Sequence, residues 1–231
     1  MNILALDTSD QVLSVALETT GKPNDYYYTE IDAGTRHSEL LMGAIDELFK
    51  KAALKPAALG LVACMKGPGS FTGLRIGFST AKGLAQALKI PLVSVPTLDC
   101  LAYSLSALPG FVLPAMDAKK GCFFAALYRG GQRITDYLDA SPETLAEELT
   151  KAGFSPSERL KLTGCGAELL FSRLAEFLPA DCIDIDPQAR RGRARELLEI
   201  AKNGTISSDG VNSGPIYLRK SDAELKMGQS G

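Results

Sequence analysis

The sequence predicts an α/β protein made of two similar lobes with a cleft between them. One observation behind this prediction is the element order βββαβαβα, which runs through the first half of the chain and appears again in the second. The other is the composition of the 231 residues, 45% hydrophobic and 23% charged, which is typical of a globular protein with a substantial core. The halves share this order but show no repeat of individual residues.

The first lobe, residues 1–108, begins with three strands. Alternating apolar and polar residues predict strands at 2–7, 12–18 and 25–31. The links between them are short and polar, which indicates an antiparallel meander. The elements expected next are a helix at 38–53, a strand at 59–65, a glycine-rich loop, a helix at 72–88, a strand at 92–95 and a helix at 97–108.

The second lobe, residues 109–231, repeats this order in a degenerate form. The elements expected there are strands at 111–117, 122–128 and 132–136, a helix at 142–151, a strand at 160–163, a helix at 167–177, a short strand at 182–185 and a helix at 193–202. Of the Gly- and Ser-rich residues 203–231, only 216–226 are predicted to be ordered.

Bulk properties exclude several classes of protein. A formal net charge of −2 predicts weak binding to RNA by the chain alone, unless its basic residues cluster. No apolar run reaches the roughly 18 residues of a membrane span, and the N-terminus is predicted to be a strand, not a signal peptide. Five widely spaced cysteines without a C-x-x-C pair argue against disulfides and structural zinc, so we expect a cytoplasmic protein.

The turn after the first strand is a candidate nucleotide site. Small hydroxyl residues and free amides at Asp7, Thr8 and Ser9 have the chemistry to cradle a phosphate. An ordinary hairpin turn uses the same residue types and is the favoured interpretation. The glycine-rich loop at 66–73 lacks the lysine placement of a phosphate loop, and Ser70 or Thr72 could simply cap the helix that follows.

Histidine catalysis is not supported by the sequence. His37 is the one histidine of the chain, and a zinc site or a nucleophile–base pair needs further partners. We expect it at a helix start, donating hydrogen bonds or lining an interface. The arginines of a basic run are candidates for contact with RNA phosphates, with a solvated helix end equally supported: Arg190, Arg191, Arg193 and Arg195.

Two helices of the first lobe have a surplus of apolar surface. At about 100° per residue, the apolar side chains of 40–52 cover roughly 200° of the helix, twice the stripe of a surface helix. The helix at 72–88 has two charged residues, Arg75 and Lys82, and a ridge of small residues that would let another helix approach. These features predict a helical interface. The alternative is burial of both helices inside their own lobe.

These motifs resemble the bacterial TsaB (YeaZ) family across essentially the whole chain. The glycine-serine segment is highly specific, and the other segments extend the resemblance. The matching segments are ILALDTS at 3–9, RHSELL at 36–41, GPGSFTGLRIG at 67–77, AKGLA at 81–85, VPTLD at 95–99 and PIYLR at 215–219. At Lys119 the sequence departs from the arginine that many relatives have there.

The resemblance implies a duplicated ribonuclease-H-like fold, as in actin, sugar kinases and the Hsp70 ATPases. It also implies a non-catalytic scaffold role in making threonylcarbamoyladenosine beside the anticodon of tRNAs that read codons starting with A. The implied partners are the paralogue TsaD, the ATPase TsaE and, through the complex, tRNA, with a homodimer when alone. The resemblance places the partner interface on the first lobe, at Arg36, His37, Leu41, Ile45, Leu48, Leu74, Arg75, Phe78 and Lys82.

TsaD itself differs at the metal site. The family of that enzyme has two histidines four residues apart, where this sequence has Thr97 and Leu101. No catalytic residue, metal or cofactor is therefore expected. Two alternatives stay open: an independent ATPase or kinase that holds a magnesium–nucleotide with Asp7 and Asp117, and a peptidase that depends on His37.

Overall fold

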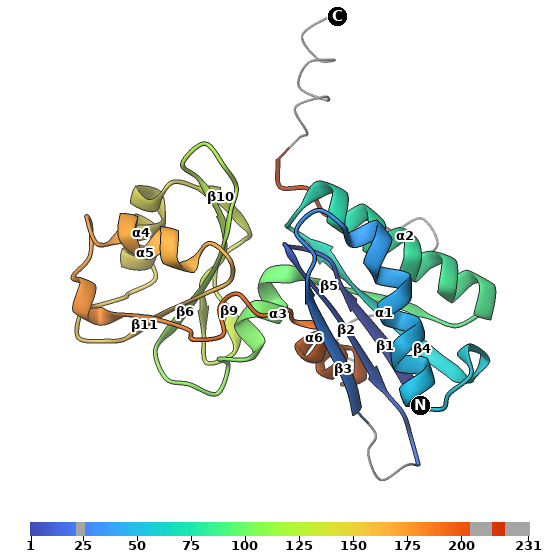
Figure 1. Ribbon diagram of the computed structural model, residues 1–231. Coiled ribbons are helices and arrows are strands. Elements are labelled where there is room, and N and C mark those ends of the chain that lie inside the picture. Colours follow the sequence, from blue (N-terminus) through green and yellow to red (C-terminus); the bar gives the residue numbers. More distant parts are fainter. Residues whose placement is uncertain (22–25, 204–213, 220–231) are drawn as a thin grey trace, which may run out of the picture.

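The computed structural model describes residues 1–21, 26–203 and 214–219 of the chain. Two lobes lie side by side, each with a β-sheet and its own helices (Figure 1). No helix among these residues is long and apolar enough to cross a membrane. The predicted two-lobed α/β architecture is confirmed.

The first lobe has a five-stranded sheet in the order β3-β2-β1-β4-β5. The predicted antiparallel meander forms its first three strands, and β4 and β5 add in parallel to β1. The strands are β1 (Asn2–Asp7), β2 (Val12–Glu18), β3 (Tyr26–Asp32), β4 (Leu59–Gly67) and β5 (Leu92–Pro96). β1 and β4 are buried on both faces and almost wholly apolar, as parallel neighbours covered by helices require.

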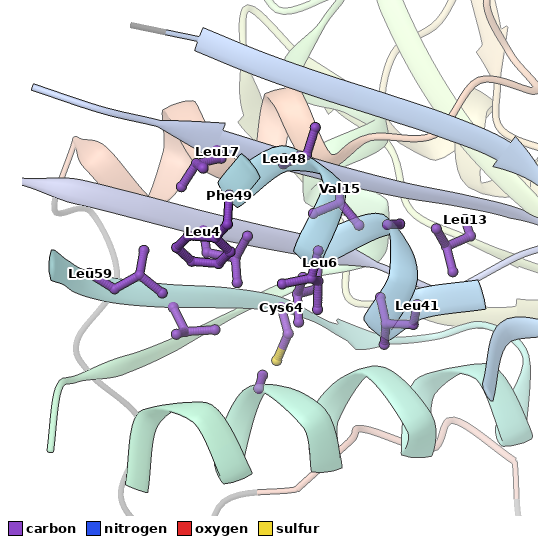
Figure 2. Close-up of a cluster of buried hydrophobic side chains, with 14 of the residues drawn as sticks. Leu4, Leu6, Leu13, Val15, Leu17, Leu41, Leu48, Phe49, Leu59 and Cys64 are labelled. Atoms are coloured by element: carbon purple, nitrogen blue, oxygen red, sulfur yellow. The ribbon is translucent and has the colours of Figure 1, made fainter. Parts of the chain in front are cut away.

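Helices cover both faces of this sheet. α1 (His37–Lys51) and α2 (Phe71–Leu88) pack on one face and contact each other, and together with the strands they enclose a core of large aliphatic side chains (Figure 2). α6 (Ala194–Lys202) packs on the opposite face, against β1, β2 and β4.

The second lobe repeats the sheet topology of the first. Its central order is β10-β7-β6-β11-β12, with an antiparallel side and a parallel side that match those of the first sheet. The strands are β6 (Phe111–Asp117), β7 (Phe123–Ala125), β8 (Tyr128–Arg129), β9 (Gln132–Arg133), β10 (Leu138–Ala140), β11 (Leu160–Thr163) and β12 (Ile183–Ile185). Its helices are α4 (Pro142–Lys151) and α5 (Ala167–Leu174). A short 3₁₀ turn occupies Ala180–Cys182 in this lobe, and another occupies Pro56–Ala58 in the first lobe.

The second meander departs from the prediction. The strand expected at 122–128 divides into β7, which pairs with the end of β6, and β8, which pairs with its beginning and with β9. The third strand of the meander is β10, beyond the expected 132–136 segment. Alternation alone does not show where a strand changes its partner.

Two helices link the lobes. α3 (Thr97–Tyr103), shorter than expected, packs its apolar side chains against those of β6 and the segment before β8 in the second lobe. α6 belongs to the second half of the sequence but packs on the first sheet. The predicted boundary at residue 109 therefore does not hold for α6, because its apolar stripe fills a face that the first lobe leaves open.

Candidate functional site

The turn after β1 is held by contacts within the chain. Asp7 is buried, and its Oδ1 accepts hydrogen bonds from the amide of Ser9 at 3.0 Å and from the Ser9 hydroxyl at 2.7 Å. The Thr8 hydroxyl donates to the carbonyl oxygen of Gly73 in α2 at 2.8 Å. Side-chain bonds to a neighbouring amide are those of an Asx-type turn, the alternative favoured by the sequence.

The second oxygen of Asp7 binds the other half of the sequence. Its Oδ2 accepts a hydrogen bond of 2.8 Å from the backbone amide of Arg193. Burial raises the pKa of Asp7 although the bonds to Arg193 and Ser9 favour its ionised form. Both oxygens of the carboxylate are thus engaged by protein donors at the junction between the lobes.

Arg193 is a buried residue, so its assignment to an RNA-binding surface is wrong. Its side chain is 2% exposed, and the guanidinium donates to polar groups of the second lobe and of the segment around α3 and α6. Its acceptors are Ser104 Oγ, Thr163 Oγ1, Asp186 Oδ2, Glu196 Oε1 and the carbonyl oxygen of Gln188, at 2.8–3.3 Å. It is the N-cap residue of α6 and lies four positions before the buried Leu197.

The other three arginines are exposed, and each has a partner. Arg190 pairs with Glu168 at 2.5 Å, and Arg191 pairs with Glu30 at 2.7 Å. The guanidinium of Arg195 lies 5.7 Å from the centroid of the Tyr26 ring. Contact between these arginines and RNA stays a prediction.

A cleft of about 860 Å³ opens between the lobes. Ser9, the glycine-rich loop and the β2–β3 edge line one side, and the end of β6 with Cys165 lines the other. Its charged lining residues are Asp10, Glu30, Asp32, Asp117, Lys119 and Arg190. The carboxylates outnumber the cationic groups, which is an unfavourable setting for a free polyanion.

Asp117 is the cleft carboxylate with the clearest electrostatic partner. The Lys119 ammonium donates to its Oδ2 at 2.7 Å, and the Lys119 backbone amide donates to its Oδ1 at 2.7 Å. The ammonium, followed by the amide, holds the pKa of Asp117 below its usual value.

The small residues of α2 allow a strand end to approach closely. A Cβ at Gly73 would lie 2.1 Å from the carbonyl oxygen of Thr8, and one at Gly77 would lie 2.2 Å from its Oγ1. The predicted ridge therefore faces the turn after β1 and not another helix. Ser70 caps α2 by accepting from the amide of Gly73, as expected.

Most of the predicted interface residues lie in the core. Figure 2 shows Leu41 and Leu48 pointing from α1 toward the strands, with Leu4, Leu6 and Val15 around them. Six of the nine are at most 4% exposed: His37, Leu41, Ile45, Leu48, Leu74 and Phe78. The wide apolar arc has a simple cause, because α1 packs on the sheet with one side and on α2 with another. Burial within the lobe, the alternative that the sequence left open, accounts for these side chains.

His37 has a structural role at the start of α1. Its ring is 4% exposed, and Nε2 donates to the carbonyl oxygen of Asp10 at 2.7 Å. It fixes the turn after β1 to the helix, in agreement with the predicted helix start.

A smaller set of side chains remains available on the outer face of the two helices. Arg36 and Arg75 are exposed, and Lys82 is half-buried. Met42, which is 53% exposed, is the large apolar side chain that α1 presents to solvent. Gly43 and Gly83 lie inside helices, and a Cβ added at either position would meet nothing within 4 Å, so no contact within the described residues explains these glycines.

The residues at the metal positions of the paralogue are part of the core. Thr97 is 2% and Leu101 is 5% exposed, and Leu101 packs in the apolar cluster between α3 and the second lobe. Among residues 1–21, 26–203 and 214–219, no three His, Cys, Asp or Glu side chains gather as metal ligands would. Burial also raises the pKa of the Cys165 thiol to about 12, which makes it a poor nucleophile.

The repeated sheet topology, the crossing helices and the cleft define a protein of the duplicated ribonuclease-H-like class. The family model described as TsaD, tRNA N6-adenosine threonylcarbamoyltransferase, matches residues 31–174. The tRNA threonylcarbamoyladenosine biosynthesis protein TsaB of Bacillus subtilis is 36% identical over 230 residues, covering 100% of this chain and 99% of its own. The chain belongs to the TsaB family.

Other relatives agree with this assignment. TsaB of Escherichia coli is 32% identical over 131 residues, which cover 56% of this chain and 55% of that protein. A Pseudomonas aeruginosa crystal structure, described as an uncharacterized protein with similarity to peptidase YEAZ, superposes with a TM-score of 0.77 at 23% identity, covering 94% and 99% of the two chains. YeaZ of the same organism superposes with a TM-score of 0.74 at 24% identity over the same shares. These structures support the fold.

Proposed function

We propose that this chain is a non-catalytic scaffold in tRNA threonylcarbamoyladenosine biosynthesis, cytoplasmic, and paired with a TsaD-type paralogue. A TsaE-type ATPase joins the pair, and tRNA is reached through the complex. The observation that carries the proposal is the similarity to a TsaB protein over the full length of both chains.

The chemistry at the lobe junction supports a role without catalysis. Thr97 and Leu101 are both buried, Leu101 in an apolar cluster, and they have a hydroxyl and a hydrocarbon in place of imidazole ligands. Asp7, which the ATPase alternative needs for a magnesium–nucleotide, lies behind the cleft with both oxygens bound to Ser9 and Arg193. These contacts within the chain support the proposed non-catalytic role.

The outer face of α1 and α2 is the surface we assign to the paralogue. Met42 supplies an exposed apolar anchor, and Gly43 and Gly83 leave room for a partner helix to pack directly on the backbone. Arg36, Arg75 and Lys82 contribute positive charge to this surface, beside the exposed carboxylates of α1, Glu39, Asp46 and Glu47. A homodimer of the isolated chain would use the same face.

Size-exclusion chromatography with light scattering tests the pairing. The chain and the TsaD-type paralogue of the same organism should elute as one complex, and Met42→Glu should weaken it at least tenfold. Leu169→Glu is the matched control, because Leu169 is equally apolar and 45% exposed but lies on α5 of the second lobe. Equal loss of affinity in both variants, or no loss in either, would show that the interface lies elsewhere.

A reconstituted modification reaction tests the scaffold role. Threonylcarbamoyladenosine, quantified by nucleoside mass spectrometry, should require this chain together with the paralogue and the ATPase. Steady ATP hydrolysis by the purified chain alone, abolished in Asp7→Ala, would instead establish the independent ATPase.

A further inference from the structure

Residues 214–219, here called the strap, run from the first lobe to the second. Figure 1 draws the strap beside the start of α2, on the side that faces the second lobe. The amide of Ile216 donates to the carbonyl oxygen of Lys66 in β4 at 2.6 Å. A Cβ at Gly67, where φ is +101°, would lie 2.6 Å from the carbonyl oxygen of Ile216. The strap therefore lies directly on the end of β4, at a glycine that allows the approach.

The middle of the strap holds an exposed cation of α2. Tyr217 packs on Phe71 with 4.8 Å between ring centroids, and its hydroxyl accepts from Arg75 Nε at 3.1 Å. The guanidinium carbon of Arg75 lies 3.8 Å from the Phe71 centroid. Arg75 is thus exposed but held by two aromatic rings, which lowers the entropy lost when a partner binds it.

The end of the strap is fixed to the second lobe. Arg219 makes a two-point ion pair with Asp139 of β10, from Nε at 2.7 Å and Nη2 at 2.5 Å. Its Nη1 donates to the carbonyl oxygen of Ala118, just after β6, at 2.7 Å. Two-point pairs of this kind are among the stronger and more directional polar contacts in proteins.

The strap also lies behind one wall of the interlobe cleft. Tyr217 and Arg219 line a cavity of about 320 Å³ next to that wall. Four residues line both this cavity and the cleft: Gly69, Ala118, Lys119 and Phe124. A displacement of the strap therefore changes the support of residues that shape the cleft.

We propose that the strap links partner binding on α2 to the interlobe cleft. When an acidic group of the partner binds Arg75, the cleft opens less often. Arg75 and Lys82 are the charged residues of α2, and the helix has no carboxylate, so the complementary group on the partner is a carboxylate. The bond to Tyr217 uses Nε and leaves the two Nη groups to bind that carboxylate. Binding therefore fixes Arg75, Tyr217 and the strap together, and the cleft opens less often.

Alkylation of Cys165 tests the first half of this coupling on the chain alone. Cys165 lines the cleft, so its labelling by iodoacetamide reports cleft opening. Arg219→Ala should speed labelling about tenfold, the effect of losing one charge-assisted pair. Tyr217→Phe, which removes only the hydroxyl, should give a smaller increase. An unchanged Cys165 rate in both variants would overturn the proposal.

Two controls separate cleft opening from other effects. Arg159→Ala removes a comparable arginine–carboxylate pair, with Asp184, that lies within the second lobe, and it should leave the Cys165 rate unchanged. Cys64, buried in the core of the first lobe, reports global unfolding and should react at the same slow rate in every variant. Parallel acceleration at Cys64 would assign the effect to unfolding and refute the coupling.

The second half of the coupling is the effect of partner binding on the cleft. Its test rests on the proposed function and uses the TsaD-type paralogue at saturating concentration. Labelling of Cys165 should slow in the wild-type complex, and Tyr217→Phe should lose part of this protection while still binding. A complex that forms without any change at Cys165 would refute the coupling and leave the proposed function intact. A wild-type chain that forms no complex would refute the proposed function, whereas the result on the chain alone would still decide the role of the strap.

Discussion

The backbone amide of Arg193 donates a hydrogen bond of 2.8 Å to Asp7, a residue 186 positions earlier in the chain. The next amide, that of Ala194, donates to the Ser14 hydroxyl of β2 at 3.0 Å. The backbone at the start of α6 is thus bound to the first lobe, and the Arg193 guanidinium is bound to Thr163 and Asp186 of the second. Arg193 therefore connects the two lobes.

Replacement of Arg193 by methionine should destabilise the protein strongly. The substitution leaves Asp186, whose side chain is 7% exposed, without its cationic partner, and breaking such a buried pair costs about 3–5 kcal/mol. Urea unfolding followed by circular dichroism measures this loss of free energy of unfolding. Arg195→Ala is the control, because Arg195 is exposed and should change stability by less than about 0.5 kcal/mol. Equal effects of both substitutions would contradict the linking role of Arg193.

The sequence predicts several elements of the second lobe well but not the contacts at the junction between the lobes. The strand at Phe111–Asp117, the helix at Pro142–Lys151 and the strand at Leu160–Thr163 match their predicted bounds, because their periodicity and flanking turns are local signals. Arg193 is not distinguished from Arg191 by composition, because a run of arginines looks the same whether or not one member faces inward. Its spacing of four from the buried Leu197 does not mark it either, because Arg191 lies three and seven positions before the buried Ala194 and Leu198.

The residues predicted to form the partner interface show a second limit of sequence patterns. An apolar arc of about 200° on a helix has the same periodicity whether a partner protein covers it or a sheet and a neighbouring helix do. Sequence patterns therefore assign Leu41, Ile45 and Phe78 to a surface although they lie in the core. The strap contacts of Tyr217 and Arg219 give no local signal, because their partners are 142 and 80 positions away in the chain.

Phe78→Asp should prevent folding and not pairing alone. Phe78 is 3% exposed within the core of the first lobe, and a carboxylate placed there loses about 3–5 kcal/mol of packing in addition to its own desolvation. Thermal unfolding should show no cooperative transition for this variant. Met42→Asp, on the exposed side of α1, should unfold within a few degrees of wild type. A stable, cooperatively folded Phe78→Asp protein would show that this helix packs differently from the structure described.

The Asp117–Lys119 pair should titrate as a local unit. Lys119→Met removes the ammonium but keeps the backbone donor, so the pKa of Asp117 should rise toward its usual value. Because the folded pKa lies below the unfolded one, the pair stabilises the protein above the ordinary aspartate pKa, and this stabilisation is lost as the pH falls through the folded pKa. The Lys119 side chain is 80% exposed, so solvent screening keeps the effect on unfolding small.

A carboxyl ¹³C NMR titration of Asp117 measures that shift. Lys161→Met is the control, because its ammonium donates to the carbonyl oxygen of Pro109 and not to Asp117. An Asp117 pKa that moves equally in both variants would assign the shift to overall charge and not to the pair.

Two glycines of α2 should respond to alanine with opposite signs. At Gly83 a Cβ meets nothing within 4 Å, so Gly83→Ala should stabilise the isolated chain by about 0.5–1 kcal/mol through helix propensity. At Gly77 a Cβ would lie 2.2 Å from Thr8 Oγ1, so Gly77→Ala should destabilise the chain by about 1–3 kcal/mol because the buried Thr8 side chain has to shift. Urea unfolding of the two variants measures both changes.

Gly83→Ala also separates stability from association. If a partner helix packs on the backbone at Gly83, the added methyl group holds the two helices apart, and affinity for the TsaD-type paralogue falls while the chain itself becomes more stable. Calorimetric titration of the paralogue into both proteins compares the affinities. A substitution that stabilises the chain and leaves the affinity unchanged would place the partner away from this part of α2, whereas a weaker complex of a more stable protein would place the partner at Gly83.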